Sequence, residues 1–180
     1  RDLQVITPMH RGPVGIQTLN QELQERLNPE SDRWSWGGRV YRRHDKVMQL
    51  RNNYYKEVFN GDIGQVCGFL GATGQLQVDF DGRVITYDPG EREDLTLAYA
   101  VTVHKAQGSE FPAVILVLTT HHYMMLQRNL LYTALTRGRR LVVILGSKRA
   151  LGMAIRNDRP IRRYTNLAAR LRETLIPPTG

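Results

Sequence analysis

The spacing of apolar residues along the chain changes twice, and this limits the folds that are open to it. In the first 35 residues, and again after residue 95, apolar runs of strand length alternate with segments of helical spacing. Strands and helices in alternation are typical of a parallel α/β sheet. Between these parts, apolar and polar residues alternate in short runs, which is typical of antiparallel strands. We therefore expect an α/β domain that is interrupted by a small β-barrel.

Residues 1–35 predict a strand, a loop and a helix. Apolar residues at 3, 5 and 6 form a strand that ends at Thr7, and four apolar residues recur at helical spacing between 16 and 27. Pro13 favours a helix start, and the Asn-Pro pair at 28–29 favours the helix end. We expect this segment to be the first part of the α/β domain.

Residues 36–95 predict a barrel of short strands. Apolar and polar residues alternate at 46–50, 62–70, 76–80 and 83–87. The Asp-Gly pair at 81–82 is a tight-hairpin signal, and several short strands joined by glycine turns favour a small barrel. Cys67 is expected in the barrel core, and Trp34 and Trp36 are expected to pack near the domain junction.

Residues 96–180 return to the α/β pattern. Helices are expected at 97–105, 127–137 and 166–175, and buried strands at 113–118 and 141–145. Ser147 is expected to cap a further helix, and His121 and His122 are expected in a solvated loop. This segment would then complete the domain that residues 1–35 begin.

The charge of the chain favours a polyanionic partner. Twenty-five lysines and arginines against seventeen acidic residues leave a net charge of +8, which predicts attraction to nucleic acid. Only four of the basic residues are lysines, and the planar arginine side chain suits bidentate phosphate recognition. A GC-rich genome would give the same preference for arginine, so only the excess of positive charge is used here.

Several classes of protein are disfavoured. No apolar run approaches the roughly 20 residues of a membrane span. A single cysteine cannot form an internal disulfide or hold a thiolate metal cluster, so a reducing, cytoplasmic setting is the simpler interpretation. No metal site is predicted. The first residue is arginine and no signal-like segment follows, so we expect a piece of a longer protein.

Two polar clusters lie next to predicted strands. Segment 102–111 reads TVHKAQGSEF and comes just before the strand at 113–118. Segment 132–140 reads YTALTRGRR and ends a helix in three arginines just before the strand at 141–145. Polar groups at the edge of a parallel sheet are in the usual place for a ligand site. An arginine held at such a junction can point across a cleft at a phosphate.

These two segments, in this order, resemble motifs V and VI of superfamily 1 helicases. The closest resemblance is to the RecD-type branch, the exodeoxyribonuclease V alpha subunit and its relatives. Segment 7–13, TPMHRGP, resembles the strand-to-loop segment of that family's second motor domain, and 53–64 resembles its inserted SH3-like barrel. The resemblance implies an α/β, RecA-like parallel-sheet motor domain (1–35 and 96–180), interrupted by an SH3-like β-barrel (36–95).

The resemblance also implies a function in recombination and repair, as part of an ATP-dependent 5′–3′ translocase or helicase on single-stranded DNA. The chain has no G-x-x-x-x-G-K-[ST] phosphate loop and no acidic strand-end motif for Mg²⁺. In the family, both belong to the first motor domain. ATP and Mg²⁺ are therefore expected in the complete enzyme, and the isolated chain is expected to be inactive. The implied partners are single-stranded DNA, the N-terminal motor domain and the nuclease or helicase subunits of a recombination complex.

The resemblance assigns the nucleotide side of the site to four residues. Arg137 matches the motif VI arginine that contacts the γ-phosphate and would neutralise charge on the transferred phosphoryl group. Glu110 matches the motif V acid that binds the ribose. Gly108 would permit a tight turn beside the ligand, and Gln107 would link the nucleotide and DNA sides. Arg139 and Arg140 are expected to be surface charges.

The DNA side is assigned to Thr102, His104 and Lys105, and Arg11 is assigned to a backbone phosphate. Such contacts bind the phosphate backbone without reading the base sequence. Two neighbouring tyrosines, Tyr54 and Tyr55, have two open interpretations, because they could stack on bases or pack within the barrel loop.

Two alternatives remain open. The chain could be a non-catalytic DNA-binding or adaptor module with an SH3-like barrel, although an adaptor has no reason to keep Glu110 and Arg137 in their motifs. It could also be a fragment of a conjugative relaxase-helicase or of a Pif1-like helicase, which share these motifs. Sequence upstream of Arg1 would separate the last two, because a relaxase carries its own nuclease domain.

Overall fold

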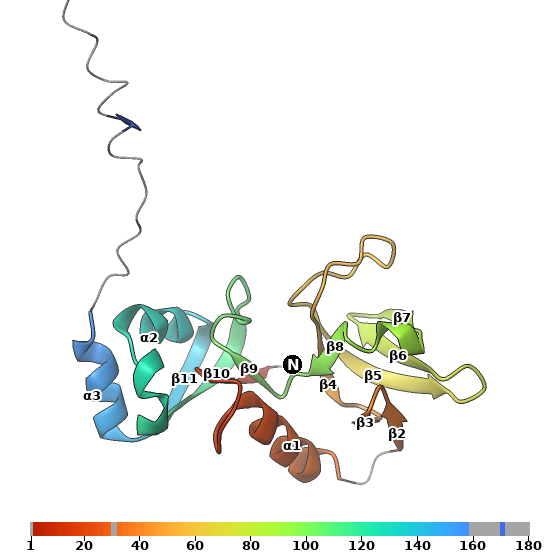
Figure 1. Cartoon of the computed structure of the whole chain (residues 1–180), viewed down its shortest axis with the longest axis horizontal. Helices are drawn as coiled ribbons and strands as arrows, with labels where there is room; N and C mark the ends of the chain where they lie inside the picture. Colours follow the sequence, from red (N-terminus) through yellow and green to blue (C-terminus); the bar gives the residue numbers. More distant parts are fainter. Residues whose placement is uncertain (1, 30–31, 159–169, 172–180) are drawn as a thin grey trace, which may run out of the picture.

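The computed structural model of the chain describes residues 2–29, 32–158 and 170–171, and the first two of these ranges form two lobes (Figure 1). One lobe is built on a four-stranded parallel sheet, and the other on a five-stranded antiparallel sheet with a separate two-stranded hairpin. The predicted fold class, a parallel-sheet α/β domain with an SH3-like barrel, is confirmed. The helix expected at 166–175 lies outside the described ranges, which include only two of its residues. No helix in the described ranges is long and apolar enough to cross a membrane.

The α/β lobe combines parts of the chain from both sides of the barrel. Its strands are β1 (Leu3–Thr7), β9 (Ala100–Thr102), β10 (Phe111–Leu118) and β11 (Gly138–Gly146), in the spatial order β11-β10-β1-β9. Its helices are α1 (Ile16–Leu27), α2 (Arg128–Leu135) and α3 (Lys148–Arg156), with a 3₁₀ helix, η2, at Thr120–Met125. Ser147 caps α3 as predicted, because its Oγ accepts from the Ala150 amide at 3.1 Å. The predicted strand at 113–118 lies between two others and is mostly buried.

The β lobe follows the predicted alternation closely. Its strands are β2 (Arg33–Trp36), β3 (Arg39–Arg42), β4 (Lys46–Gln49), β5 (Ile63–Leu70), β6 (Gln75–Phe80), β7 (Arg83–Tyr87) and β8 (Leu95–Leu97), with a 3₁₀ helix, η1, at Pro89–Glu91. Asp81 and Gly82 have φ values of 55° and 90°, as a tight hairpin between β6 and β7 requires. The antiparallel strands start at 33 and end at 97, a few residues beyond the expected barrel limits of 36 and 95.

The predicted helix at 97–105 is wrong. The segment contains the end of β8, strand β9 and a series of turns. Residues 100–102 pair in parallel with residues 5–7 of β1 and are buried. Pairing with a distant strand and burial therefore outweigh the helical tendency of the local alanines.

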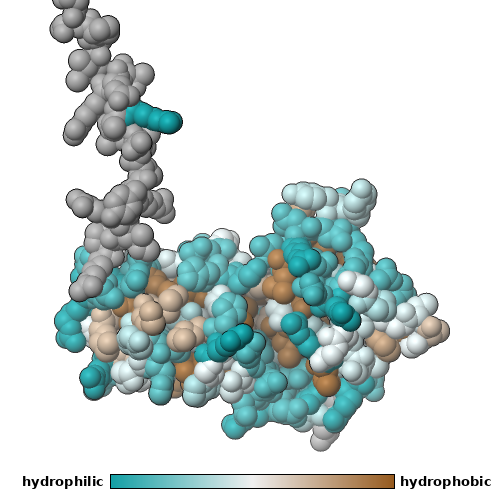
Figure 2. Space-filling model, viewed as in Figure 1, coloured by the Kyte–Doolittle hydropathy of each residue, from teal (hydrophilic) through white to brown (hydrophobic). Residues whose placement is uncertain are grey.

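The prediction that 141–145 is a buried strand is half right. The segment lies in β11, but in the described part of the chain β11 has a neighbouring strand on one side only. Leu141, Val143 and Leu145 are 55%, 43% and 62% exposed. Figure 2 shows apolar residues on the surface of this lobe among mostly hydrophilic ones.

Helix α1 ends where predicted, but it starts later than predicted and its buried side chains are polar. It begins at Ile16 after Gly15, so Pro13 lies in the preceding loop. Its buried residues are Asn20 and Gln24, whereas the apolar Leu27 is 67% exposed. The Asn20 side chain bonds the backbone N–H and C=O of Ala100 at 2.9 Å each. Polar side chains therefore dock this helix, because Asn20 satisfies backbone groups of β9 and Gln24 donates to the Val40 carbonyl of β3.

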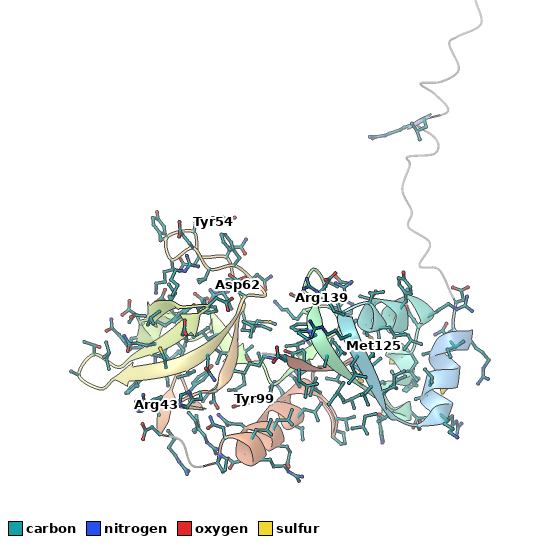
Figure 3. All side chains as sticks on the ribbon, turned by 180° about the vertical axis from the view of Figure 1, so that it is seen from behind. Arg43, Tyr54, Asp62, Tyr99, Met125 and Arg139 are labelled. Atoms are coloured by element: carbon teal, nitrogen blue, oxygen red, sulfur yellow. The ribbon has the colours of Figure 1, made fainter. Side chains whose placement is uncertain are left out.

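A hydrogen-bond network around Asp45 joins the two lobes. Asp45 is fully buried in the turn between β3 and β4. Its carboxylate accepts from the Arg42 amide at 2.7 Å and from the Tyr99 hydroxyl at 2.9 Å. Gln24 and Asn28, at the end of α1, donate their side-chain N–H groups to the same carboxylate. One buried acid thus binds the β lobe to α1 and to the segment before β9, where Figure 3 shows Tyr99 between the lobes.

Trp34 and Trp36 pack against the core of the β lobe, although packing near the domain junction was expected, and Cys67 is less buried than predicted. Trp36 is 3% exposed within the lobe's core, and the Trp34 ring stacks on Phe69 at 5.8 Å between centroids. Cys67 is only partly buried, and this burial raises the pKa of its thiol.

The expectation for the histidine pair is wrong for His122, which is 1% exposed. Its Nδ1 accepts from the Thr119 amide at 3.3 Å, and this places an acceptor rather than a protonated nitrogen on that side. Burial, and secondly repulsion from His121, lower the pKa of His122 below its usual 6.5. The site is therefore built for the neutral imidazole.

This site predicts a loss of stability in mild acid. Because the pKa of His122 is lower in the folded state, the unfolded state binds more protons near and below pH 6.5. The contribution of His122 to the free energy of unfolding is complete above its unfolded-state pKa and is lost as the pH falls below that value. The free energy of unfolding, measured with urea between about pH 7 and pH 5, should fall less steeply in His122→Gln than in the wild type. Equal slopes would contradict this.

Candidate nucleotide and DNA site

The segment that resembles motif V runs from the edge of the sheet formed by the carboxyl ends of the parallel strands to the edge formed by their amino ends. Thr102 ends β9 and is in register with Thr7, at the carboxyl end of β1. Phe111 begins β10 and is in register with Gly138, at the amino end of β11. The turns at 103–110 connect these two edges. Residues assigned to DNA and to nucleotide are therefore positioned at opposite ends of one short segment.

Arg137 is held between the two motif segments. It follows α2 directly and precedes β11. Its guanidinium donates to the Ser109 carbonyl at 3.1 Å, to the Thr133 carbonyl at 3.0 Å and to the Thr136 hydroxyl at 3.0 Å. Its own carbonyl accepts from the Phe111 amide at 2.8 Å. The guanidinium is therefore fixed in place, and it has five N–H groups of which these bonds use three.

Glu110 has a partner that the sequence analysis treated as a surface charge. Arg139 donates from Nε to the Glu110 carboxylate at 2.7 Å, with both side chains at least half exposed. Figure 3 shows Arg139 at the edge of the α/β lobe that faces the β lobe. An exposed pair of this kind is worth about 1 kcal/mol or less. The carboxylate can therefore exchange Arg139 for another donor at little cost.

The turn between the two edges depends on Gly108. Its φ is +86°, a left-handed conformation that favours glycine, and no atom lies within 4 Å of the position a Cβ would take. Gln107 is exposed, and its backbone N–H donates to the His104 carbonyl at 3.3 Å. Gly108 and Gln107 thus lie at the surface of the turn, beside open space.

The residues assigned to DNA differ in how far they reach solvent. Thr102 is buried, and its hydroxyl accepts from the Lys105 amide at 3.2 Å, so it stabilises the turn from inside. His104 and Arg11 are exposed. Arg11 lies in the loop after β1, which ends at the same sheet edge as β9. Thr102 can therefore position this edge, whereas His104 and Arg11 are available to a ligand.

Lys105 connects the segment to the β lobe. Its Nζ donates to the side-chain oxygen of Asn60 at 2.8 Å. A cleft of about 270 Å³ lies beside this contact between the two lobes. Its lining residues are Lys46, Gly61, Asp62, Ile63, Asp81, Ser109 and Phe111. Asn60 was not found by sequence reasoning, because a contact over 45 positions leaves no local signal.

Within the described ranges, no group of three or more histidine, cysteine or acidic side chains could hold a metal ion. The site described so far can therefore contribute cationic and hydrogen-bonding groups to a nucleotide. It fixes one arginine and offers an exposed carboxylate at the start of two parallel strands. Such an arrangement suits a phosphate-bearing ligand that also carries hydroxyl groups.

Two family models match the chain. Residues 19–80 match the ATP-dependent RecD-like DNA helicase SH3 domain, and residues 97–145 match the UvrD-like helicase C-terminal domain. The second match contains both motif segments and Arg137. Both models describe domains of helicases, so the chain is similar over these residues to an SH3 domain and a C-terminal domain of that class.

Relatives specify the branch of that class. The ATP-dependent RecD2 DNA helicase of Deinococcus radiodurans is 44% identical over 170 residues, which are 94% of this chain and 23% of the relative. The RecBCD enzyme subunit RecD of Mycolicibacterium smegmatis is 32% identical over 162 residues, 90% of this chain and 28% of the relative. The resemblance to RecD-type helicases is therefore confirmed. The chain spans about a quarter of the length of these curated relatives.

Solved structures support the fold. The Bacteroides Pif1 helicase in complex with ADP-AlF3 and ssDNA has a TM-score of 0.60 at 19% identity, over 94% of this chain and 44% of that chain. The Candida albicans Pif1 helicase has a TM-score of 0.58 at 13% identity, over 97% of this chain and 50% of that chain. At these identities the likeness concerns the fold alone, so the branch is assigned by the sequence relatives.

Proposed function

We propose that this chain is the C-terminal part of an ATP-dependent 5′–3′ single-stranded-DNA translocase or helicase of recombination and repair. Residues 1–35 and 96–180 would form its second RecA-like motor domain, and 36–95 the inserted SH3-like barrel. The observation that carries the proposal is the position of Arg137. The Arg137 guanidinium donates to the carbonyl of Ser109, the residue just before Glu110. The two motif segments therefore present a cation and a carboxylate together.

The nucleotide in this proposal is ATP. Arg137 would neutralise charge on the transferred phosphoryl group, and Glu110 would accept from a ribose hydroxyl after leaving Arg139. Gly108 would keep the turn close to the ligand, and Gln107 would link the nucleotide side of the site to the DNA side. The described residues offer no metal-ligand cluster. The phosphate loop and the Mg²⁺ ligands would come from an N-terminal motor domain, and the isolated chain would not hydrolyse ATP.

The DNA in this proposal follows the opposite edge of the sheet. His104, Lys105 and Arg11 would contact backbone phosphates, and Thr102 would fix the turn that carries two of them. The net charge of +8 supports such contacts. Nuclease or helicase subunits of a recombination complex remain proposed partners, and the cytoplasm remains the proposed location.

One alternative stays in view, a non-catalytic DNA-binding adaptor. It would need the barrel and the positive charge but not a restrained Arg137 beside Glu110. A conjugative relaxase-helicase or a Pif1-like helicase would share the fold, but the sequence relatives favour the RecD-type branch. We therefore retain the helicase proposal.

The proposal is tested by DNA-stimulated ATP hydrolysis and strand separation. The full-length protein should hydrolyse ATP faster with single-stranded DNA, and it should open duplexes that have a 5′ single-stranded tail but not those with a 3′ tail. The 180-residue chain should show no hydrolysis above background. DNA binding by the full-length protein without any ATP turnover would favour the adaptor instead.

A further inference from the structure

Two tyrosines of the β lobe are exposed to solvent although the lobe has a well-formed aromatic core. They lie in the loop between β4 and β5, where Tyr55 is fully exposed and Tyr54 is 74% exposed. Figure 3 shows Tyr54 near the tip of this loop, which projects from the lobe. Tyr41 and Tyr87, by contrast, are fully buried. Burial in the barrel core therefore explains neither ring, and Tyr54 keeps a contact within the loop whereas Tyr55 is fully exposed.

The loop that carries these rings is ordered by its own hydrogen bonds. Asn53 and Val58 exchange backbone hydrogen bonds of 2.7 and 3.1 Å, and the Val58 side chain is buried in the lobe's core. The Asn60 backbone N–H donates to the side-chain oxygen of Asn52 at 2.9 Å. Glu57 has a left-handed φ of 50°, which persists only where the surroundings hold it. The rings are thus presented by a fixed loop, which lowers the entropy lost on binding.

The charged side chains next to the rings are neutralised by ion pairs, so they do not repel an anionic ligand. Glu57 is paired with Arg83 at 2.9 Å, and Lys56 is paired with Glu91. The loop therefore presents no unpaired carboxylate beside the tyrosines. Tyr54 also packs edge-to-face on Phe59 at 6.0 Å between centroids. This contact supports one ring, which stays 74% exposed.

The base of the loop contacts the segment that we assign to DNA. Asn60 accepts from Lys105, which lies in the turn three residues after Thr102. A strand whose phosphates lie along the Thr102 edge would therefore pass close to the loop. Aromatic side chains beside a basic track stack on successive bases without regard to their sequence.

We propose that this loop is a stacking platform for the bases of single-stranded DNA, with Tyr55 as its main stacking side chain and Tyr54 as a second. The inference rests on the proposed function, because it adds base contacts to the phosphate contacts of the motor domain. The bases of this DNA are unpaired, since only a base with a free face can stack on an exposed ring.

The test compares two probes that share phosphates and differ in bases. Binding of the nucleotide-free, full-length protein is measured by fluorescence anisotropy with an oligothymidylate and with an abasic oligomer of equal length. Tyr55→Ala should weaken binding to oligothymidylate about five-fold or more and leave binding to the abasic oligomer unchanged. Tyr55→Phe keeps the ring and should bind both probes like the wild type. Tyr123→Ala removes a tyrosine of the other lobe that is 63% exposed and should change neither affinity.

The outcomes separate this inference from the proposed function. If Tyr55→Ala and the wild type bind oligothymidylate equally, the platform does not exist and the loop faces solvent or another protein, while DNA binding stands. An equal loss on both probes would mean a backbone or folding effect and would also overturn the inference. If the wild type binds neither probe at low salt, the proposed DNA-binding function fails, and the inference fails with it.

Discussion

Replacing Arg137 with alanine in the full-length protein is expected to lower ATP turnover by about 10³- to 10⁵-fold, the range of arginine fingers. The physical reason is preorganisation. Three acceptors from both motif segments already hold the guanidinium, so little reorganisation is needed when charge develops on the phosphoryl group. Lysine should restore only a small part of the rate, because a point charge cannot make the same set of bonds.

The matched control is Arg140→Ala, an exposed arginine three residues further along the chain. It should leave turnover within about two-fold, as expected for a surface charge. DNA affinity and thermal unfolding should change little in Arg137→Ala, which excludes a folding defect as the cause of the lost rate. Turnover close to that of the wild type in Arg137→Ala would show that the motif VI assignment is wrong.

Local signals predicted most of the fold. Strand β1, helix α1, the Asp81-Gly82 hairpin and the cap at Ser147 each depend on residues that are neighbours in the chain. Hydrophobic period, turn chemistry and capping act over a few residues, so they can be read from sequence. The break in period also predicted that a barrel interrupts a parallel sheet.

The errors concern long-range pairing and the environment of each element. Segment 97–105 has helix-forming residues, and only pairing with β1 makes 100–102 a strand. Strand β11 has an apolar sequence typical of a buried strand, but its burial depends on what lies beside it. Helix α1 buries Asn20 and Gln24 because they bond backbone groups of β9 and β3, which lie elsewhere in the chain. None of these contacts leaves a mark in the local pattern.

The candidate site shows the same division. The motif segments located Arg137 and Glu110, but not Arg139 as the partner of Glu110 or Asn60 as the partner of Lys105. The positions of the motif residues are known, and their roles stay predictions until variants are measured. The role of Thr102 could have been inferred from its place at the end of an apolar segment, because a threonine there can accept from the backbone N–H three residues further on.

Asp45→Ala is expected to lower the free energy of unfolding by about 3 to 5 kcal/mol, because several buried donors lose their acceptor together and each unsatisfied donor costs about 1 to 3 kcal/mol. The change removes the acceptor of four donors, which come from Gln24, Asn28, Arg42 and Tyr99. Buried donors without an acceptor keep their full desolvation penalty. For a chain of this size, the melting temperature should fall by about 6 to 20 °C.

The control is Asp32→Ala, which removes an acid whose ion pair with Arg43 is 66% and 45% exposed on its two sides. Such a pair contributes about 1 kcal/mol or less, so the melting temperature of Asp32→Ala should stay near that of the wild type. The Asp45 network is also the buried polar connection between α1, the turn before β4 and the segment before β9. Its loss should therefore separate the unfolding of the two lobes, and calorimetry should show a broader or double transition. If Asp45→Ala unfolds in one sharp step within 1 kcal/mol of the wild type, the network does not hold the lobes together.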